Sequence, residues 1–176
     1  FISKEKYEEL IKYFKENGEL KAEDEQETHY FSGDEDLRIQ KNKFYSKIWL
    51  KKGKIHDEAR EEIEIKSNKE DFDKMEKLFE VLGYDTEIKW FRNRKEFDWN
   101  GIKISLDYTK GYGYIIELEK MVSDDKKEKA LEDLKVRLKE LGIELTSREK
   151  FDETYKNYKE NWKSLIEESD RENQNG

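Results

Sequence analysis

The chain has 176 residues, about the size of one domain, and 45% of them are charged while 34% are hydrophobic. With 44 acidic and 36 basic residues, its formal charge of -8 argues against nonspecific nucleic-acid binding, and no such partner is expected. The absence of cysteine excludes disulfides, thiolate zinc sites and a cysteine nucleophile. No apolar run approaches the roughly 20 residues that span a bilayer and no signal peptide is visible, so a cytoplasmic protein without a membrane partner is expected.

The first predicted element is an amphipathic helix, because Tyr7, Leu10, Ile11 and Phe14 follow the helical spacing. Ser3 is its candidate cap. Strand-like runs then follow at 27–31 ("ETHYF"), 36–40 ("DLRIQ"), 43–53 ("KFYSKIWLKKG") and 60–66 ("REEIEIK"). A second helix is predicted over 72–82, with a stripe that ends at Leu82 and Asn68 as its candidate cap.

Further strands are predicted over 88–108 and 111–120. The first of these contains Asn100-Gly101, a strong hairpin signal. A third helix has its stripe from Leu131 to Leu141, and a fourth begins with "TSRE" (146–149), which reads as a capping box. The aromatic face of the fourth helix is expected to pack, and residues 167–176 are expected to be a disordered tail behind a single domain at 1–166. Successive strands can pair antiparallel, which indicates the α+β class.

Charged residues recur at every second position of these strands. In "EEIEIK", for example, Glu62, Glu64 and Lys66 alternate with Ile63 and Ile65. Because alternate residues of a strand show opposite faces, one face of the sheet is charged. That face is either ordinary solvated surface or the lining of a closed sheet, since a barrel of about eight strands can enclose one small ligand.

The mixture of signs favours a lined site. Carboxylates without cysteine or histidine suit Mg²⁺ or Mn²⁺, whereas arginine forks match phosphate oxygens. Asp107 either holds an arginine in place or contacts a metal. The candidate metal ligands are Glu62, Glu64, Asp107, Glu117 and Glu119, and the candidate phosphate ligands are Arg38, Lys51, Arg60, Lys66, Arg92 and Arg94.

In chain order, these runs resemble the motifs of the CYTH superfamily, the triphosphate tunnel metalloenzymes. "QETHYF" resembles Q-x-D-x-Y-F with Thr28 at the aspartate, and "LRIQ" resembles L-R-I-R with Gln40 at the second arginine. "IWLKKG" resembles L-T-Y-K-G, "REEIEIK" resembles R-x-E-x-E, and "RNRKEF" resembles K-x-R-x-x-Y. "SLDYTKGYGYIIELE" resembles L-D-x-V-x-G-L-G-x-F-x-E-I-E, with matches at Asp107, Gly111, Gly113, Glu117 and Glu119. The family's first strand, E-x-E-x-K, has no match ahead of the first helix.

The resemblance implies an eight-stranded antiparallel β-barrel, the triphosphate tunnel, with helices packed outside and the first family strand missing from this chain. It also implies one or two divalent ions and a small-molecule triphosphate such as ATP, thiamine triphosphate or tripolyphosphate. Hydrolysis of the triphosphate is the main expectation. Cyclisation of ATP to cyclic AMP and pyrophosphate, as in class IV adenylate cyclases, and a non-catalytic sensor are the alternatives. Monomer and homodimer are left open.

Overall fold

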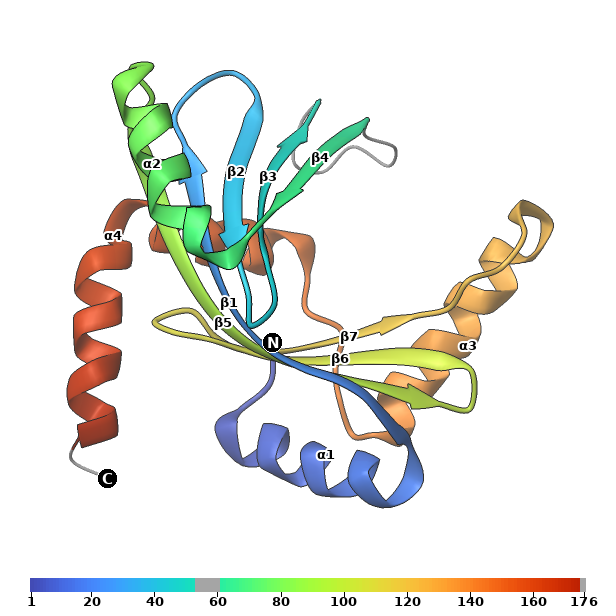
Figure 1. Ribbon diagram of the computed structural model, residues 1–176. Coiled ribbons are helices and arrows are strands. Elements are labelled where there is room, and N and C mark those ends of the chain that lie inside the picture. Colours follow the sequence, from blue (N-terminus) through green and yellow to red (C-terminus); the bar gives the residue numbers. More distant parts are fainter. Residues whose placement is uncertain (53–60, 175–176) are drawn as a thin grey trace.

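The computed structural model describes residues 1–52 and 61–174, and it confirms the α+β class (Figure 1). All neighbouring strands pair antiparallel in the order β4-β3-β2-β1-β5-β6-β7. The strands are β1 Glu19–Phe31, β2 Asp36–Lys41, β3 Ser46–Lys51, β4 Glu62–Ser67, β5 Thr86–Trp99, β6 Ile102–Thr109 and β7 Gly113–Glu119, and the helices are α1 Lys4–Asn17, α2 Phe72–Val81, α3 Lys127–Glu140 and α4 Arg148–Gln174.

The sheet has seven strands in the described part of the chain, where the resemblance implies eight. Its edges are β4 and β7, and Ile2 makes an isolated antiparallel bridge to Tyr114 beside β7. The long strands β1 and β5 are neighbours in the middle of the sheet. Strands β2–β4 follow on the β1 side and β6–β7 on the β5 side, and the two groups extend in different directions (Figure 1). Closure of this bent sheet into a tunnel stays a prediction.

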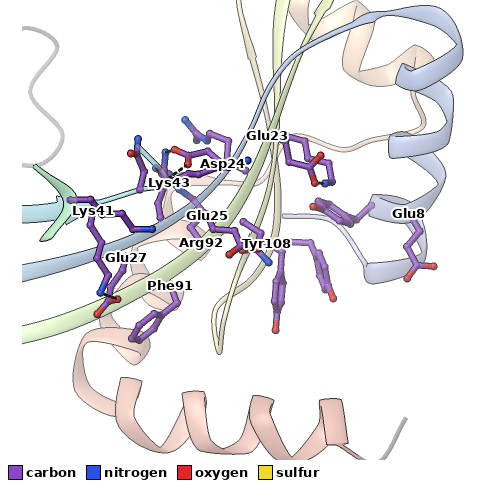
Figure 2. Close-up of a pocket in the computed structure, with 18 residues that line it drawn as sticks. Glu8, Glu23, Asp24, Glu25, Glu27, Lys41, Lys43, Phe91, Arg92 and Tyr108 are labelled. Atoms are coloured by element: carbon purple, nitrogen blue, oxygen red, sulfur yellow. Dashed lines mark hydrogen bonds and ion pairs between the residues drawn. The ribbon is translucent and has the colours of Figure 1, made fainter. Parts of the chain in front are cut away.

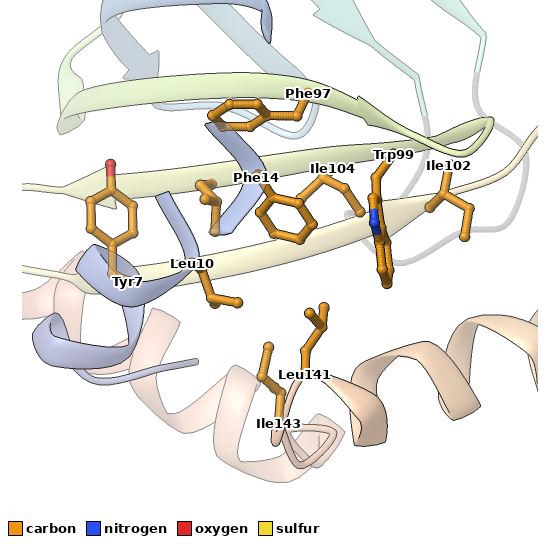
Figure 3. Packing of buried hydrophobic residues seen from close by; sticks show 10 residues of the cluster. Tyr7, Leu10, Phe14, Phe97, Trp99, Ile102, Ile104, Leu141 and Ile143 are labelled. Carbon is orange, nitrogen blue, oxygen red and sulfur yellow. The ribbon is translucent and has the colours of Figure 1, made fainter. Parts of the chain in front are cut away.

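One face of the sheet carries the main hydrophobic core (Figure 3). Phe97 and Ile104 from β5 and β6 pack against Leu10 and Phe14 of α1, and Leu141 at the end of α3 joins the same cluster. Because strand side chains alternate, the residues between them on β5 and β6 point to the opposite, charged face. We call the apolar side the helix face.

A second cluster joins α2 to β1 and β2 on the helix face through Phe72, Met75, Phe31 and Ile39. The apolar side of the strands was expected to lie under helices, but Ile63 and Ile65 of β4 are 42% and 57% exposed, so that expectation is wrong for this strand. The reason is that β4 is the edge strand, beyond the strands β2 and β3 on which α2 packs. Within the described residues, no helix is long and apolar enough to cross a membrane.

The local signals for turns and helix ends were correct at some positions and shifted at others. Asn100 and Gly101 both have positive φ, 55° and 77°, as the predicted two-residue hairpin turn requires. Ser3 caps α1 through the Lys6 amide, whereas the Asn68 side chain makes no capping hydrogen bond. The fourth helix is capped by Ser147 instead of Thr146, because the Thr146 hydroxyl accepts a hydrogen bond from the amino terminus at 2.5 Å.

Two leucines that were assigned to buried helix stripes are exposed. Leu82 lies just after α2 and Leu131 lies on α3, and their exposed fractions are 62% and 54%. On α3 the buried residue is Ala130, and Leu134 and Leu138 pack against the core. Helical spacing therefore predicted the core-facing residues correctly in the last turns of α3 and incorrectly in its first turns.

The last helix is longer than predicted and covers part of the charged face. It runs to Gln174, so residues 167–174 are helical and their assignment to a disordered tail is wrong. Ser169 hydrogen-bonds the Tyr108 hydroxyl at 2.9 Å, and Asp170 forms an ion pair with Lys110. These contacts hold the end of the helix to β6 and its following turn, which the composition of the tail did not reveal.

Candidate active site on the charged face

The strand register brings most of the predicted charged residues to one face of the sheet. Cross-strand partners point to the same side, and the pairings Arg38↔Trp49, Trp49↔Glu64 and Arg94↔Asp107 link strands from both ends of the sheet. The face defined by this register carries Arg38, Lys51, Glu62, Glu64, Lys66, Arg92, Arg94, Asp107, Glu117 and Glu119. Arg60 lies outside the described residues.

Arg94 forms the most extensive ion pair on this face. Its Nε and Nη2 donate to the two oxygens of Asp107 at 2.7 and 2.5 Å, and Nη2 also donates to Glu117 at 3.0 Å. Burial alone would lower the pKa of Arg94, but Asp107 and Glu117 outweigh it and raise that pKa. Asp107 therefore holds an arginine in place in this structure, which is one of its two predicted roles.

Arg38 is held by a carboxylate and by aromatic rings. Asp36 accepts hydrogen bonds from Nε and Nη2 of Arg38 at 2.6 and 2.5 Å. The guanidinium carbon lies 4.4 Å from the ring centre of Tyr30 and 5.1 Å from that of Trp49, within cation–π distance. The Arg38 side chain is only 13% exposed, so this geometry is fixed before any ligand binds.

Arg92 differs from the other two arginines because its closest partner is neutral. The Gln26 Oε1 atom accepts hydrogen bonds from Nε and Nη2 of Arg92 at 3.0 and 2.5 Å. Its contact with a carboxylate is longer, since the Asp107 Oδ2 atom lies 3.5 Å from Nη1. Burial, and then the neighbouring Arg94, lower the pKa of Arg92. Gln26 belongs to the quoted motif "QETHYF", but the sequence did not reveal that it contacts Arg92.

The predicted acids are paired with basic side chains. Glu62 lies 2.7 Å from Lys51 and accepts a hydrogen bond from the Trp49 indole, while Glu64 lies 2.7 Å from Lys47. These lysines are the largest cause that lowers the pKa of each glutamate. Lys66 is 60% exposed and lies 3.5 Å from Glu64. Lys47 and Trp49 share this face and are not among the predicted site residues.

The four glutamates lie on the two edge strands of the sheet. Glu62 and Glu64 are on β4, while Glu117 and Glu119 are on β7, where Glu119 lies 3.4 Å from Lys103. Within the described residues, no three histidine, aspartate or glutamate side chains converge closely enough to hold a metal ion by themselves. The metal role of these acids stays a prediction.

A small pocket of about 160 Å³ lies where α4 meets the charged face. Arg38, Arg92, Asp107 and Glu117 line it, together with Tyr155 of α4 and other aromatic residues. Burial, and then Tyr30, raise the pKa of Tyr155 to about 12, so its hydroxyl is neutral at physiological pH. The remaining lining residues are Tyr30, Trp90, Thr109, Tyr112, Ile115 and Phe151.

A larger groove of about 820 Å³ is lined by residues of α1, β1 and β5 and by Lys69 ahead of α2 (Figure 2). Its side chains include Glu23, Glu25 and Lys95 on the helix face, and Lys95 forms an ion pair with Glu23. It also contains Tyr108, which stacks on Tyr114 with ring centres 4.8 Å apart. Acidic and basic groups are mixed here. Arg92 and Arg94 border this groove as well, whereas Arg38 lines only the small pocket.

Comparison with known proteins identifies the family of this chain. The family model described as CYTH domain matches residues 1–155, and the chain therefore belongs to the CYTH family. A protein of Methanocaldococcus jannaschii named "Putative adenylate cyclase MJ0240" is 36% identical over 129 residues, which cover 67% of this chain and 73% of that protein.

Solved structures from two archaea share the fold. The PH1819 protein of Pyrococcus horikoshii OT3 is 30% identical, with a TM-score of 0.64 over 80% of this chain and 88% of its own. A conserved hypothetical protein of Pyrococcus furiosus is 25% identical, also with a TM-score of 0.64, over 81% of this chain and 87% of its own. The fold implied by the sequence motifs is thus confirmed at the level of the family.

Proposed function

We propose that the charged face binds the phosphate chain of a small-molecule triphosphate and that the protein processes this ligand with a divalent metal ion. The observation that carries the proposal is the set of partly buried arginines Arg38, Arg92 and Arg94, whose side chains are 13%, 23% and 16% exposed. Arginine forks bind phosphate oxygens in pairs, and desolvation strengthens such contacts. Family membership supports the same substrate class.

A divalent ion fits the chemistry of this face, although the protein alone does not complete its coordination. Mg²⁺ is commonly held by one or two carboxylates while substrate phosphates and water supply the other ligands. Glu117 and Glu119, two positions apart on one side of β7, would provide such a pair, and Glu62 and Glu64 on β4 provide another. The bound ion would neutralise charge on the phosphates.

Cyclisation of ATP to cyclic AMP and pyrophosphate is the first candidate reaction. The name of the M. jannaschii relative supports it. An aromatic wall that includes Trp90 and Tyr155 lies beside Arg38 and Arg92, and it offers a surface on which an organic ring can pack. In this reaction the arginines would hold the phosphate chain while the ribose 3′-oxygen reaches the α-phosphorus.

Hydrolysis of a triphosphate is the second candidate, and the size of the pocket favours it. The space beside the arginines measures about 160 Å³, which suits a phosphoryl group or one ring better than a whole nucleoside. Hydrolysis needs only the phosphate chain and a positioned water. The basic side chains would then serve to orient the chain and to stabilise the charge that develops on it.

A product assay separates these reactions. Purified protein is incubated with Mg²⁺ or Mn²⁺ and with ATP, thiamine triphosphate or tripolyphosphate, and phosphorus NMR resolves the products. Pyrophosphate with cyclic AMP indicates the cyclase, and inorganic phosphate indicates the hydrolase. Tight binding without turnover would show a sensor, and absence of both binding and turnover would contradict the proposal.

A further inference from the structure

The three arginines of the charged face differ in how their charge is balanced. Arg38 and Arg94 each donate two hydrogen bonds to a carboxylate, from Asp36 and Asp107 respectively. Arg92 donates its two close hydrogen bonds to the amide oxygen of Gln26. Asp107 lies 3.5 Å from Arg92 and is already bound to Arg94 at shorter distance. Among described residues, Arg92 therefore has the weakest local compensation of the three.

A buried guanidinium without a full counter-charge is unfavourable in the ligand-free protein. The Gln26 amide satisfies two donors of Arg92 and fixes the orientation of its plane, but it supplies no negative charge. A glutamate of nearly the same shape would satisfy the same donors and neutralise the charge of Arg92, but it would lose the hydrogen bond that the Gln26 Nε2 atom donates to Asp24 at 3.0 Å. The amide thus leaves the charge of Arg92 available for an anion.

Hydroxyl groups beside Arg92 point to the same kind of ligand. Thr109 is the cross-strand partner of Arg92, and both residues line the small pocket with Tyr112. The Oγ1 atom of Thr109 and the hydroxyl of Tyr112 are buried and have no hydrogen-bond partner among the described residues. Buried polar groups are nearly always paired. A phosphoryl group would accept from these hydroxyls and from Arg92.

We propose that Gln26 is a positioning residue that orients Arg92 without neutralising it, and that Arg92 is consequently the primary anchor for a phosphoryl group. The inference rests on the proposed function, since it assigns the anchor within the same triphosphate site. A carboxylate at position 26 would orient Arg92 in the same way but would neutralise its charge, and so weaken its attraction for a phosphoryl group.

The substitution Gln26→Glu keeps the side-chain shape and adds one negative charge. It is tested in the Asp24→Asn background, because the Gln26 Nε2 atom donates to Asp24 at 3.0 Å and a glutamate would otherwise face that carboxylate. Thermal unfolding without ligand and calorimetric titration with tripolyphosphate are measured for each variant. Relative to Asp24→Asn alone, Gln26→Glu is expected to raise the unfolding temperature, since Arg92 gains a counter-charge, and to weaken tripolyphosphate binding about ten- to a hundredfold. Asn93→Asp is the matched control, because it adds the same charge at an exposed neighbour on the opposite face.

Gln26→Met provides a second arm, since it removes the acceptor without adding charge. It is expected to lower both stability and affinity, whereas Gln26→Glu moves them in opposite directions. A purely structural role for Gln26 would make stability and affinity change together in both variants. Equal affinity of the Asp24→Asn protein with and without Gln26→Glu, with wild type binding tightly, would overturn this inference and leave the proposed function standing. Wild type that fails to bind tripolyphosphate would instead contradict the proposed function itself.

Discussion

The Asp107 carboxylate is 4% exposed and accepts hydrogen bonds from Arg94 at 2.7 and 2.5 Å. Removing one partner of a buried ion pair leaves the other charge uncompensated, which costs about 3 kcal/mol. We therefore expect Asp107→Asn to lower the free energy of unfolding by about 3 kcal/mol in metal-free buffer, as measured by urea denaturation. Glu119→Gln, at an exposed residue paired at 3.4 Å, should change it by less than about 1 kcal/mol. A ligand-free Asp107→Asn protein as stable as wild type would instead favour the metal role of Asp107.

Glu27 is expected to make the stability of the protein depend on pH. Burial raises the pKa of Glu27, but hydrogen bonds from His29 and Lys41 outweigh it and lower the pKa to about 2. The folded-state pKa lies below the unfolded value of 4.5, so this contribution to stability is complete above about pH 4.5 and is lost as pH falls toward 2. Urea denaturation between pH 6 and 3 should show a shallower loss of stability in Glu27→Gln than in wild type.

The control for Glu27 is Glu25→Gln, an exposed glutamate on the same face of β1. Its pH profile should follow that of wild type. Identical profiles for all three proteins would show that the cluster of Glu27, His29 and Lys41 does not contribute to the pH dependence.

At the scale of elements, α4 depends on a close contact with the turn between β6 and β7. A Cβ atom added to Gly111 would lie 2.8 Å from the backbone carbon of Leu165 in α4, and the φ of Gly111 is +71°. Tyr158 and Trp162 of α4 also donate to the backbone oxygens of Lys89 and Glu87 on β5, at 2.9 and 2.8 Å. The turn, the strand and the helix are therefore joined as one unit.

Gly111→Ala is expected to destabilise the protein more than Gly101→Ala. The two glycines have similar φ values, +71° and +77°, so both substitutions carry a backbone strain of about 1 kcal/mol or more, but only Gly111 faces another element closely. The difference between the two free energies of unfolding, measured in urea, isolates the contact with α4. Equal losses would show that α4 moves aside without cost.

The alternation of side chains made much of the charged face predictable. It places Glu62 with Glu64, and Glu117 with Glu119, on one side of a strand whatever the strand pairs with. The sequence did not reveal the partners, because pairing joins distant residues, such as Gln26 and Arg92, which are 66 positions apart. It also missed the helical end of α4, whose contacts to Tyr108 and Lys110 are tertiary.

At the scale of the whole molecule, two cavities compete as the place where a triphosphate binds. One is the small pocket beside α4, which Arg38 and Arg92 line, and the other is the larger groove, which Arg92 and Lys95 both line. Arg92 and Lys95 lie on the same strand but point to opposite faces. Substitution of each by glutamine removes one positive charge. Because Lys95 lines the groove and not the small pocket, the effect of Lys95→Gln distinguishes the two locations.

Calorimetric titration of tripolyphosphate into wild type, Arg92→Gln and Lys95→Gln, at constant Mg²⁺ and salt, decides where the triphosphate binds. If the charged face is the site, Arg92→Gln should bind about ten- to a hundredfold more weakly than wild type, because it loses a charge-assisted pair of hydrogen bonds. Lys95→Gln should stay within about threefold of wild type, since that lysine faces the other side of the sheet. Equal weakening in both variants, or a larger loss in Lys95→Gln, would contradict the assignment of the triphosphate site to the charged face.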